Sequence, residues 1–184
     1  WAAALQLLGW ARRLRAAPDT VSYNAAFAAC GAERLWEATL SMMREMSYRD
    51  VEADAVTSNA AMASCDRGQQ WLWVFELFAE MEEYVDSKPA AQGPGLDDVS
   101  LGTAASACAH ARRWRAAIWL LQEARSQMSR LPGVTARNAA ISACDRGLQW
   151  SLAFDLMRGM VWDAREPDSV TCNAVISACE KGRQ

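Results

Sequence analysis

A repeat of about 35 residues is the feature of this sequence that most constrains its fold. Tryptophans recur with spacings of 35, 35, 43 and 36 residues, at Trp1, Trp36, Trp71, Trp114 and Trp150. Cysteines precede each following tryptophan position by six residues, at Cys30, Cys65, Cys108, Cys144 and Cys179. Six residues before those cysteines stands a third column, Asn24, Asn59, Gly102, Asn138 and Asn173. A fixed period of this length predicts repeats that stack to bury a shared core.

Each repeat contains two helical patterns. The first runs from the asparagine column to the cysteine column in small residues, as in Asn24–Cys30. The second opens at the tryptophan column and continues as an apolar stripe with helical spacing. No strand-like alternation appears. The sequence therefore predicts an all-α fold, a right-handed α-solenoid of stacked helix-turn-helix repeats.

The ends of the predicted helices carry turn residues. Glycines follow the first helical pattern at Gly31, Gly68, Gly147 and Gly182. Because glycine takes the left-handed conformation cheaply, we expect left-handed helix ends there. Proline followed by aspartate, at Pro18–Asp19 and Pro167–Asp168, is typical of a place where one helix stops and the next is capped.

The period divides the chain into one solenoid with two incomplete repeats at its ends. A stretch rich in Asp, Pro and Gly near residues 82–97 lengthens one repeat, and we expect it to form a surface loop. The absence of an initiator Met before Trp1 indicates that the N-terminus and any targeting segment are missing. The expected segments are 1–19 (second helix of a truncated repeat), 20–54, 55–97, 98–133, 134–168 and 169–184 (first helix of a truncated repeat).

Composition and motifs exclude several classes of function. The net charge of -3 gives the whole molecule no attraction for a polyanion, and no run of eighteen apolar residues suggests a membrane span. A single histidine and the lack of any C-x-x-C pair leave no metal ligand set, so the cysteines and tryptophans are interpreted as reduced, buried packing residues. No catalytic motif is present. We expect no enzyme activity, no cofactor, no metal and no small-molecule substrate.

Two stretches resemble the pentatricopeptide repeat family: Pro18–Asn24, and Val170–Gly182 with the sequence VTCNAVISACEKG. The resemblance implies an α-solenoid that binds single-stranded RNA, one nucleotide per repeat. It also implies a place in an organelle, chloroplast or mitochondrion, in RNA processing, stability or translation.

The resemblance implies which side chains read the bases. In that family the readers are a residue in the first turns of the first helix and the last residue of the same repeat. An asparagine amide both donates and accepts, as a base edge requires, and the Asn/Asp pair of the family favours uracil. Helix capping is the alternative, and sufficient, role for the aspartates. The implied pairs are Asn24 with Asp54, Asn59 with Asp97, and Asn138 with Asp168, with Asn173 lacking a partner in this chain and Gly102 with Gly133 reading nothing.

Two further columns complete the implied interface. Valines expected just before the first helix would sandwich bases, at Val21, Val56, Val99 and Val170. Basic residues near the end of the first helix would meet phosphates or simply be solvated, at Arg67, His110, Arg146 and Lys181.

Two functions follow from these observations. The first is sequence-selective binding of single-stranded RNA with a weak preference for uracil, read as U, U, any base, U along the four repeats. The second is a protein-interaction scaffold of the tetratricopeptide type without RNA binding. The acidic composition and the glycine pair of the third repeat favour the second function, and the period with its Asn and Asp columns favours the first.

Overall fold

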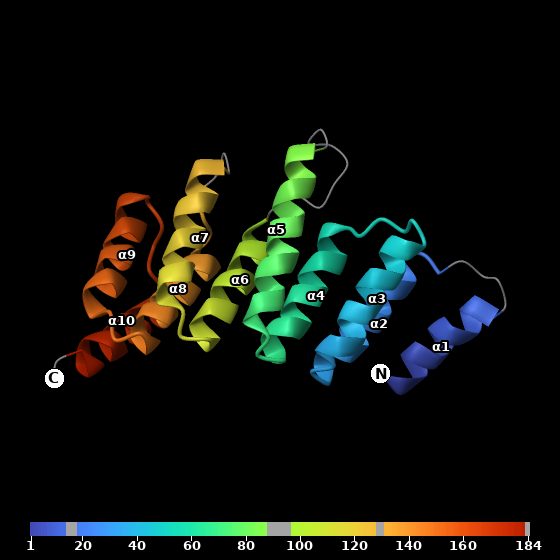
Figure 1. Ribbon diagram of the computed structural model, residues 1–184. Coiled ribbons are helices and arrows are strands. Elements are labelled where there is room, and N and C mark those ends of the chain that lie inside the picture. The colour runs from blue at the N-terminus through green and yellow to red at the C-terminus, as the bar shows by residue number, and fades with distance from the viewer. Residues whose placement is uncertain (14–17, 88–96, 128–130, 183–184) are drawn as a thin grey trace. The chain divides into compact units, whose positions relative to one another are not determined.

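The computed structural model describes residues 1–13, 18–87, 97–127 and 131–182, and these residues form ten α-helices and no strand. The helices belong to two compact units, Trp1–Leu96 and Asp97–Gln184 (Figure 1). The all-α class predicted from the repeat is confirmed. The prediction of a single solenoid with the listed repeat boundaries stays a prediction.

Unit 1 contains two helix pairs preceded by a single helix. Its first helices α2 and α4 pack side by side, and α3 and α5 each pack against α4. Tyr23, Phe27 and Met46 are among its fully buried side chains. Its helices are α1 (Ala2–Arg13), α2 (Thr20–Ala32), α3 (Trp36–Tyr48), α4 (Ala55–Arg67) and α5 (Trp71–Ser87).

Unit 2 repeats the same arrangement. Its first helices stack in the order α6, α8, α10, while α7 packs against α6 and α8, and α9 against α8 and α10. Ile141, Cys144 and Met160 are fully buried in its core. Its helices are α6 (Asp98–His110), α7 (Trp114–Gln127), α8 (Val134–Arg146), α9 (Trp150–Trp162) and α10 (Ser169–Lys181).

Most first helices begin at an aspartate. The side chain of Asp54 accepts a hydrogen bond of 2.7 Å from the Thr57 backbone N–H, and thereby satisfies one of the unpaired donors of the first turn. The same cap is formed at Asp19, Asp97 and Asp168. Helix capping, one of the two roles considered for this column, is therefore confirmed.

The glycines at positions 68, 147 and 182 are explained by packing, whereas Gly31 lies inside α2. The expected left-handed conformation is wrong, because no glycine of the described residues has a positive φ. Gly68 and Gly147 have φ of -77° and -88°. The left-handed residues come one position later, as at Leu148 with φ of 58°. A Cβ on Gly68 would lie 2.5 Å from Cδ1 of Trp36, so the indole of the preceding repeat leaves no room for a side chain. Gly182 relates to Trp150 in the same way.

The contact between tryptophan and glycine also shows where the tryptophan column lies, at the boundary between neighbouring repeats. Trp36, Trp71 and Trp114 are half-buried and Trp150 is exposed, so the expectation that the column lies in the core is wrong. The cysteines differ from the tryptophans, because Cys30, Cys65, Cys108 and Cys144 are buried free thiols as predicted, with Cys179 half-buried.

The predicted loop near residues 82–97 begins later than expected. Helix α5 continues to Ser87, so residues 82–87 are helical, and 88–96 lie outside the described residues. None of the described helices is both long and apolar enough to cross a membrane.

Candidate functional site

In unit 1, the amide of Asn24 is held by two side chains of the α3–α4 connection and α4. Asn24 lies in the second turn of α2 and donates from Nδ2 to Oδ1 of Asp54, at 3.4 Å. The Thr57 hydroxyl lies 2.7 Å from Oδ1 of Asn24 and 2.7 Å from Oδ1 of Asp54. Because Nδ2 faces a carboxylate and Oδ1 faces a hydroxyl donor, the amide has one preferred orientation.

Unit 2 contains the same group of three. Nδ2 of Asn138 lies 3.1 Å from each carboxylate oxygen of Asp168, and the Thr171 hydroxyl shares its one proton between Oδ1 of Asn138 and Oδ1 of Asp168. Thr171 is buried, whereas Asn138 is half-buried, so the amide lies at the surface with its support beneath it. The two groups, Asn24–Asp54–Thr57 and Asn138–Asp168–Thr171, are called the amide triads.

The carboxylates of the amide triads are stabilised in their charged form. Hydrogen bonds from the Thr171 backbone N–H and hydroxyl, and then from Asn138, lower the pKa of Asp168. Burial acts to raise the pKa of Asp54, but hydrogen bonds from Thr57 and Asn24 outweigh it and the pKa is lowered. Both aspartates are therefore acceptors at neutral pH.

The third predicted pair has one member in each unit. Asn59 is half-buried on α4 and Asp97 caps α6. Their pairing stays a prediction. Asn173 is exposed on α10.

The glycine pair of the third repeat has a different structure. Gly102 is buried, and a Cβ there would lie 3.3 Å from Cγ2 of Thr135. Gly133 is the N-cap residue of α8 and donates its N–H to Oδ1 of Asp98, at 2.9 Å. A Cβ on Gly133 would meet that carboxylate at 2.9 Å. At both positions the space of a side chain is thus taken by an internal contact.

The valine column lies inside the first helices rather than just before them, which corrects the expectation. Val21 is the second residue of α2, and Val56, Val99 and Val170 are the second residues of α4, α6 and α10. At this position a side chain points away from the core: Val21 is 73% exposed and Val56 62%. Each unit thus exposes two apolar side chains at matching positions of its first helices, and the matching residue of α8 is Thr135.

The basic column links successive first helices. Arg67 donates to the carbonyl oxygen of Gly31 at 2.7 Å, and Arg146 to that of Ala109 at 3.2 Å, each at the end of the preceding first helix. A guanidinium has five donors, so each arginine keeps others for a further ligand. Lys181 is paired with Asp145 at 2.8 Å.

The threonines of the amide triads were missed by sequence reasoning. Their signal was present, because Asp54 and Asp168 are each followed three residues later by a threonine, the spacing of a capping box. In the part of the chain that the structure describes, no group of three metal-ligating side chains is found.

Comparison with known proteins identifies a family for one repeat and a fold for the chain. Residues 21–51 match the family model described as PPR repeat. The crystal structure of the pentatricopeptide repeat protein PPR10 from maize is similar over 100% of this chain, with 21% identity and a TM-score of 0.71. PPR10 in complex with an 18-nt psaJ RNA element is similar over 97% of this chain, with 21% identity and a TM-score of 0.79. In both cases the chain spans 25% of the length of the matched structure. No curated protein sequence matches.

Proposed function

Since the chain contains a pentatricopeptide repeat and has the fold of PPR10, we propose that it binds single-stranded RNA with the asparagine column facing the bases. The observation that carries the proposal is the amide triad, found once in each unit. In each triad an exposed or half-buried amide is oriented by a carboxylate that does not itself need to contact the base.

The amide triads suit a pyrimidine edge. One hydrogen of Nδ2 is used by the aspartate and one lone pair of Oδ1 by the threonine, which leaves one N–H donor and one acceptor lone pair on the amide for a base. Uracil offers the complementary carbonyl acceptor and N3–H donor. We infer a preference for uracil at the repeats of Asn24, Asn59 and Asn138, and none at the third repeat.

The exposed valines and arginines extend the proposed interface. Val21, Val56, Val99 and Val170 supply apolar contact to base faces, weaker than the ~1–3 kcal/mol of an aromatic platform. Arg67 and Arg146 supply phosphate contacts with their remaining donors, whereas the ion pair with Asp145 reduces the contribution of Lys181. Few cations are engaged, so the dependence of affinity on salt should be shallow. By family resemblance we place this activity in organelle RNA processing, stability or translation.

The test is fluorescence anisotropy of labelled oligouridine and oligoadenosine at fixed salt. We expect the chain to bind oligouridine more tightly than oligoadenosine. The substitution Asn138→Ala should reduce this preference about tenfold, which lies within the ~1–3 kcal/mol of a good amide contact. Gln122→Ala removes an exposed amide on α7 and should leave the preference unchanged. Equal, millimolar binding of both oligonucleotides would refute base reading.

A protein-interaction scaffold is the second candidate. The net charge of -3 favours it, because an acidic molecule repels polyanions beyond the contact zone. Failure of both oligonucleotides to bind at low salt, where phosphate contacts are strongest, would leave this candidate as the better function.

A further inference from the structure

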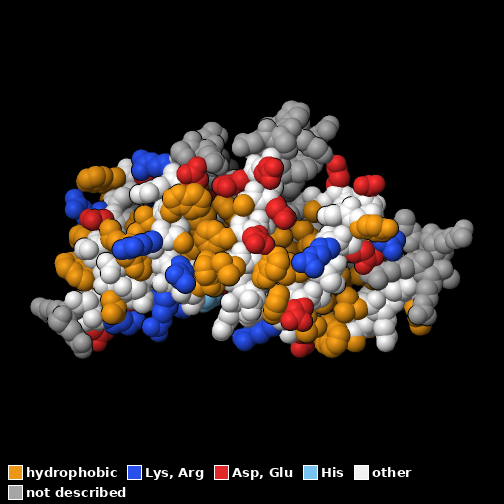
Figure 2. Space-filling model, viewed as in Figure 1, with side chains coloured by type: hydrophobic (Ala, Val, Ile, Leu, Met, Phe, Trp, Pro, Cys, Tyr) orange, Lys and Arg blue, Asp and Glu red, His pale blue; other side chains and the backbone are white. Residues whose placement is uncertain are grey.

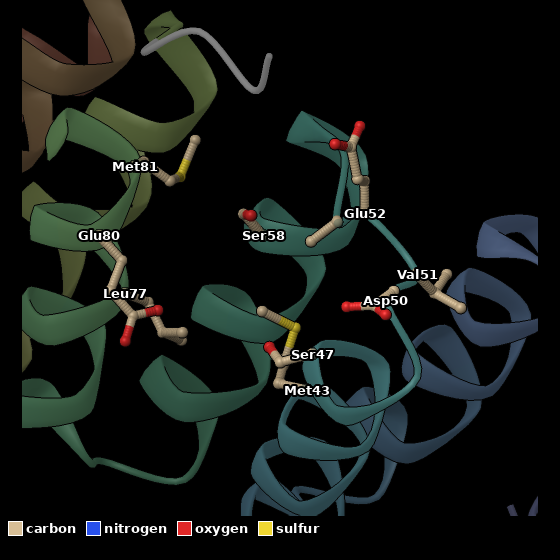
Figure 3. Close-up of a pocket in the computed structure, with 10 residues that line it drawn as sticks. Met43, Ser47, Asp50, Val51, Glu52, Ser58, Leu77, Glu80 and Met81 are labelled. Carbon is tan, nitrogen blue, oxygen red and sulfur yellow. The ribbon is translucent and has the colours of Figure 1, made fainter. Parts of the chain in front are cut away.

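A pocket of about 390 Å³ opens in unit 1 between α4 and the two second helices α3 and α5 (Figure 3). This volume lies within the ~300–1,000 Å³ typical of ligand sites. Figure 3 shows residues of α3 and the following loop on one side, residues of α5 on the other, and Ser58 of α4 between them. The lining includes three long apolar side chains and three carboxylates: Met43, Leu77 and Met81, and Asp50, Glu52 and Glu80.

One position of the first helix, the residue before the asparagine column, differs between the repeats. The residue before the asparagine column is Tyr23 in the first repeat and Arg137 in the fourth. Both are buried long side chains that reach the second helix or its end. The Tyr23 hydroxyl donates to Glu45 at 3.1 Å, and the Arg137 guanidinium is paired with Asp163. In these repeats the protein itself supplies a donor to an acidic side chain.

In the second repeat this position is Ser58, which is too short to do the same. Ser58 is only 5% exposed, yet it lines the pocket, and its hydroxyl has no hydrogen-bond partner among the described residues. Glu80 stands nine residues after Trp71, as Glu45 does after Trp36, and is the matching acceptor. Within the described part of the chain no donor or cation pairs with Glu80. The Ser58 hydroxyl and the Glu80 carboxylate thus face one pocket, and the described residues supply no partner to either.

The charge around the pocket is negative. Desolvation, together with Glu76 and Glu83 on the same helix, raises the pKa of Glu80. Figure 2 shows acidic side chains gathered over α5. Neither Arg44 of α3 nor Arg49, which follows α3, lines the pocket: Arg44 lies over the ring of Trp73, and Arg49 is paired with Glu45 at 2.9 Å. The pocket therefore favours a cationic occupant with an apolar stem.

We propose that this pocket binds an arginine side chain presented by a protein partner, with the aliphatic stem on Leu77 and Met81 and the guanidinium at Glu80. The pairing of Arg137 with Asp163 in unit 2 is the internal precedent for this occupant. Arginine suits the site better than lysine because its fork of five donors reaches a carboxylate and the Ser58 hydroxyl together, and because it is less strongly hydrated. The proposal is independent of RNA binding.

The test uses the full chain with ¹³C-labelled methionine methyl groups and two peptides, acetyl-Gly-Leu-Arg-Leu-Gly-amide and its citrulline counterpart. Citrulline has the shape of arginine without the charge. The arginine peptide should shift the Met43 and Met81 signals saturably and leave that of Met160, in the core of unit 2, unchanged. The citrulline peptide should bind about tenfold more weakly. Equal shifts from both peptides, or no shift at Met43 and Met81, would overturn the proposal.

Variants of the pocket sharpen the test. Glu80→Gln should weaken binding of the arginine peptide about tenfold, whereas Glu37→Gln, an exposed position in the first turn of α3 that does not line the pocket, should not. Ser58→Arg should fill the pocket from within and remove the methyl shifts while the protein keeps its Tm. Equal losses from Glu80→Gln and Glu37→Gln would overturn the proposal even if Ser58→Arg fails to fold. Oligouridine binding should be unaffected by Glu80→Gln, which separates this proposal from RNA binding.

Discussion

The indole of Trp114 occupies the space that a side chain at Gly147 would need: a Cβ on Gly147 would lie 2.4 Å from Cδ1 of the tryptophan. Trp114 begins the second helix of one repeat and Gly147 ends the first helix of the next. The same relationship joins Trp36 to Gly68 and Trp150 to Gly182. The tryptophan and glycine columns are therefore two halves of one contact between neighbouring repeats.

Gly147→Ala should destabilise unit 2 by about 1–3 kcal/mol, the usual cost of overpacking a close contact. The matched control is Gly159→Ala in α9, where a Cβ would meet nothing within 4 Å. That change should stabilise the protein by up to ~1 kcal/mol through helix propensity. Urea unfolding of both variants measures the difference. Similar effects of the two substitutions would show that the indole does not restrict position 147.

Thr171→Val should weaken both the cap of α10 and the orientation of Asn138. The variant loses a buried hydroxyl that contacts Asn138 and Asp168, at a cost of about 1–2 kcal/mol in the free energy of unfolding. The preference for oligouridine should fall as well. Thr103→Val is the control, because its hydroxyl contacts only the Val99 carbonyl within its own helix. A fall in stability with unchanged RNA preference would argue against the amide triad as a reader.

Acid should destabilise the fold through its capping aspartates. Hydrogen bonds from Ser22 lower the pKa of Asp19, as those from Thr171 lower the pKa of Asp168. A carboxyl whose folded pKa is lowered stabilises the folded state above its unfolded pKa, ~3.9, and this contribution disappears as pH falls through the folded value. The free energy of unfolding should therefore decline below about pH 4.

The variant Asp168→Asn keeps a capping side chain but removes the titration, so its decline with acid should be shallower. Asp155→Asn removes an exposed carboxylate of α9 that caps no helix, and should follow the parent protein. Chemical unfolding followed from pH 6 to pH 2 makes the comparison. Parallel curves for all three proteins would contradict the role given to Asp168.

Buried thiols should resist alkylation in the folded protein. Burial raises the pKa of Cys65 and of Cys144 to about 11, so at neutral pH neither forms the reactive thiolate. Cys172 is exposed and should react first with iodoacetamide. Mass spectrometry of the labelled peptides, with and without urea, gives the order. Modification of Cys144 as fast as Cys172 in the native protein would contradict the packing of α8.

Base changes in a short RNA should distinguish the third repeat from the fourth. The Asp98 carboxylate occupies the space beside Gly133, where a side chain would otherwise lie. Replacing the base that faces this repeat should therefore leave the affinity for the RNA unchanged. Replacing the uracil that faces Asn138 should cost about 1–3 kcal/mol. Competition binding with singly substituted oligouridines measures both. Equal losses at the two positions would exclude separate reading by repeats.

The sequence predicted the helices well because their signals are local and recur. Periodic apolar residues and the aspartate caps set where each helix lies and begins. The reason for the glycines was not predictable, since Gly68 depends on Trp36 in another repeat, and the two are 32 positions apart. The residue before the asparagine column was also missed. Its members differ in type, Tyr23, Ser58 and Arg137 among them, and only their shared burial reveals a common position.

Each amide triad crosses the border of the repeat to which its asparagine belongs. Asn24 and Asp54 lie before the start of α4, whereas Thr57 lies inside it. Exchange of whole repeats of about 35 residues at that border would separate the threonine from the asparagine amide that it orients. Recombination points for altered RNA preference should therefore be moved downstream of Thr57 and Thr171, so that each grafted module carries its own support.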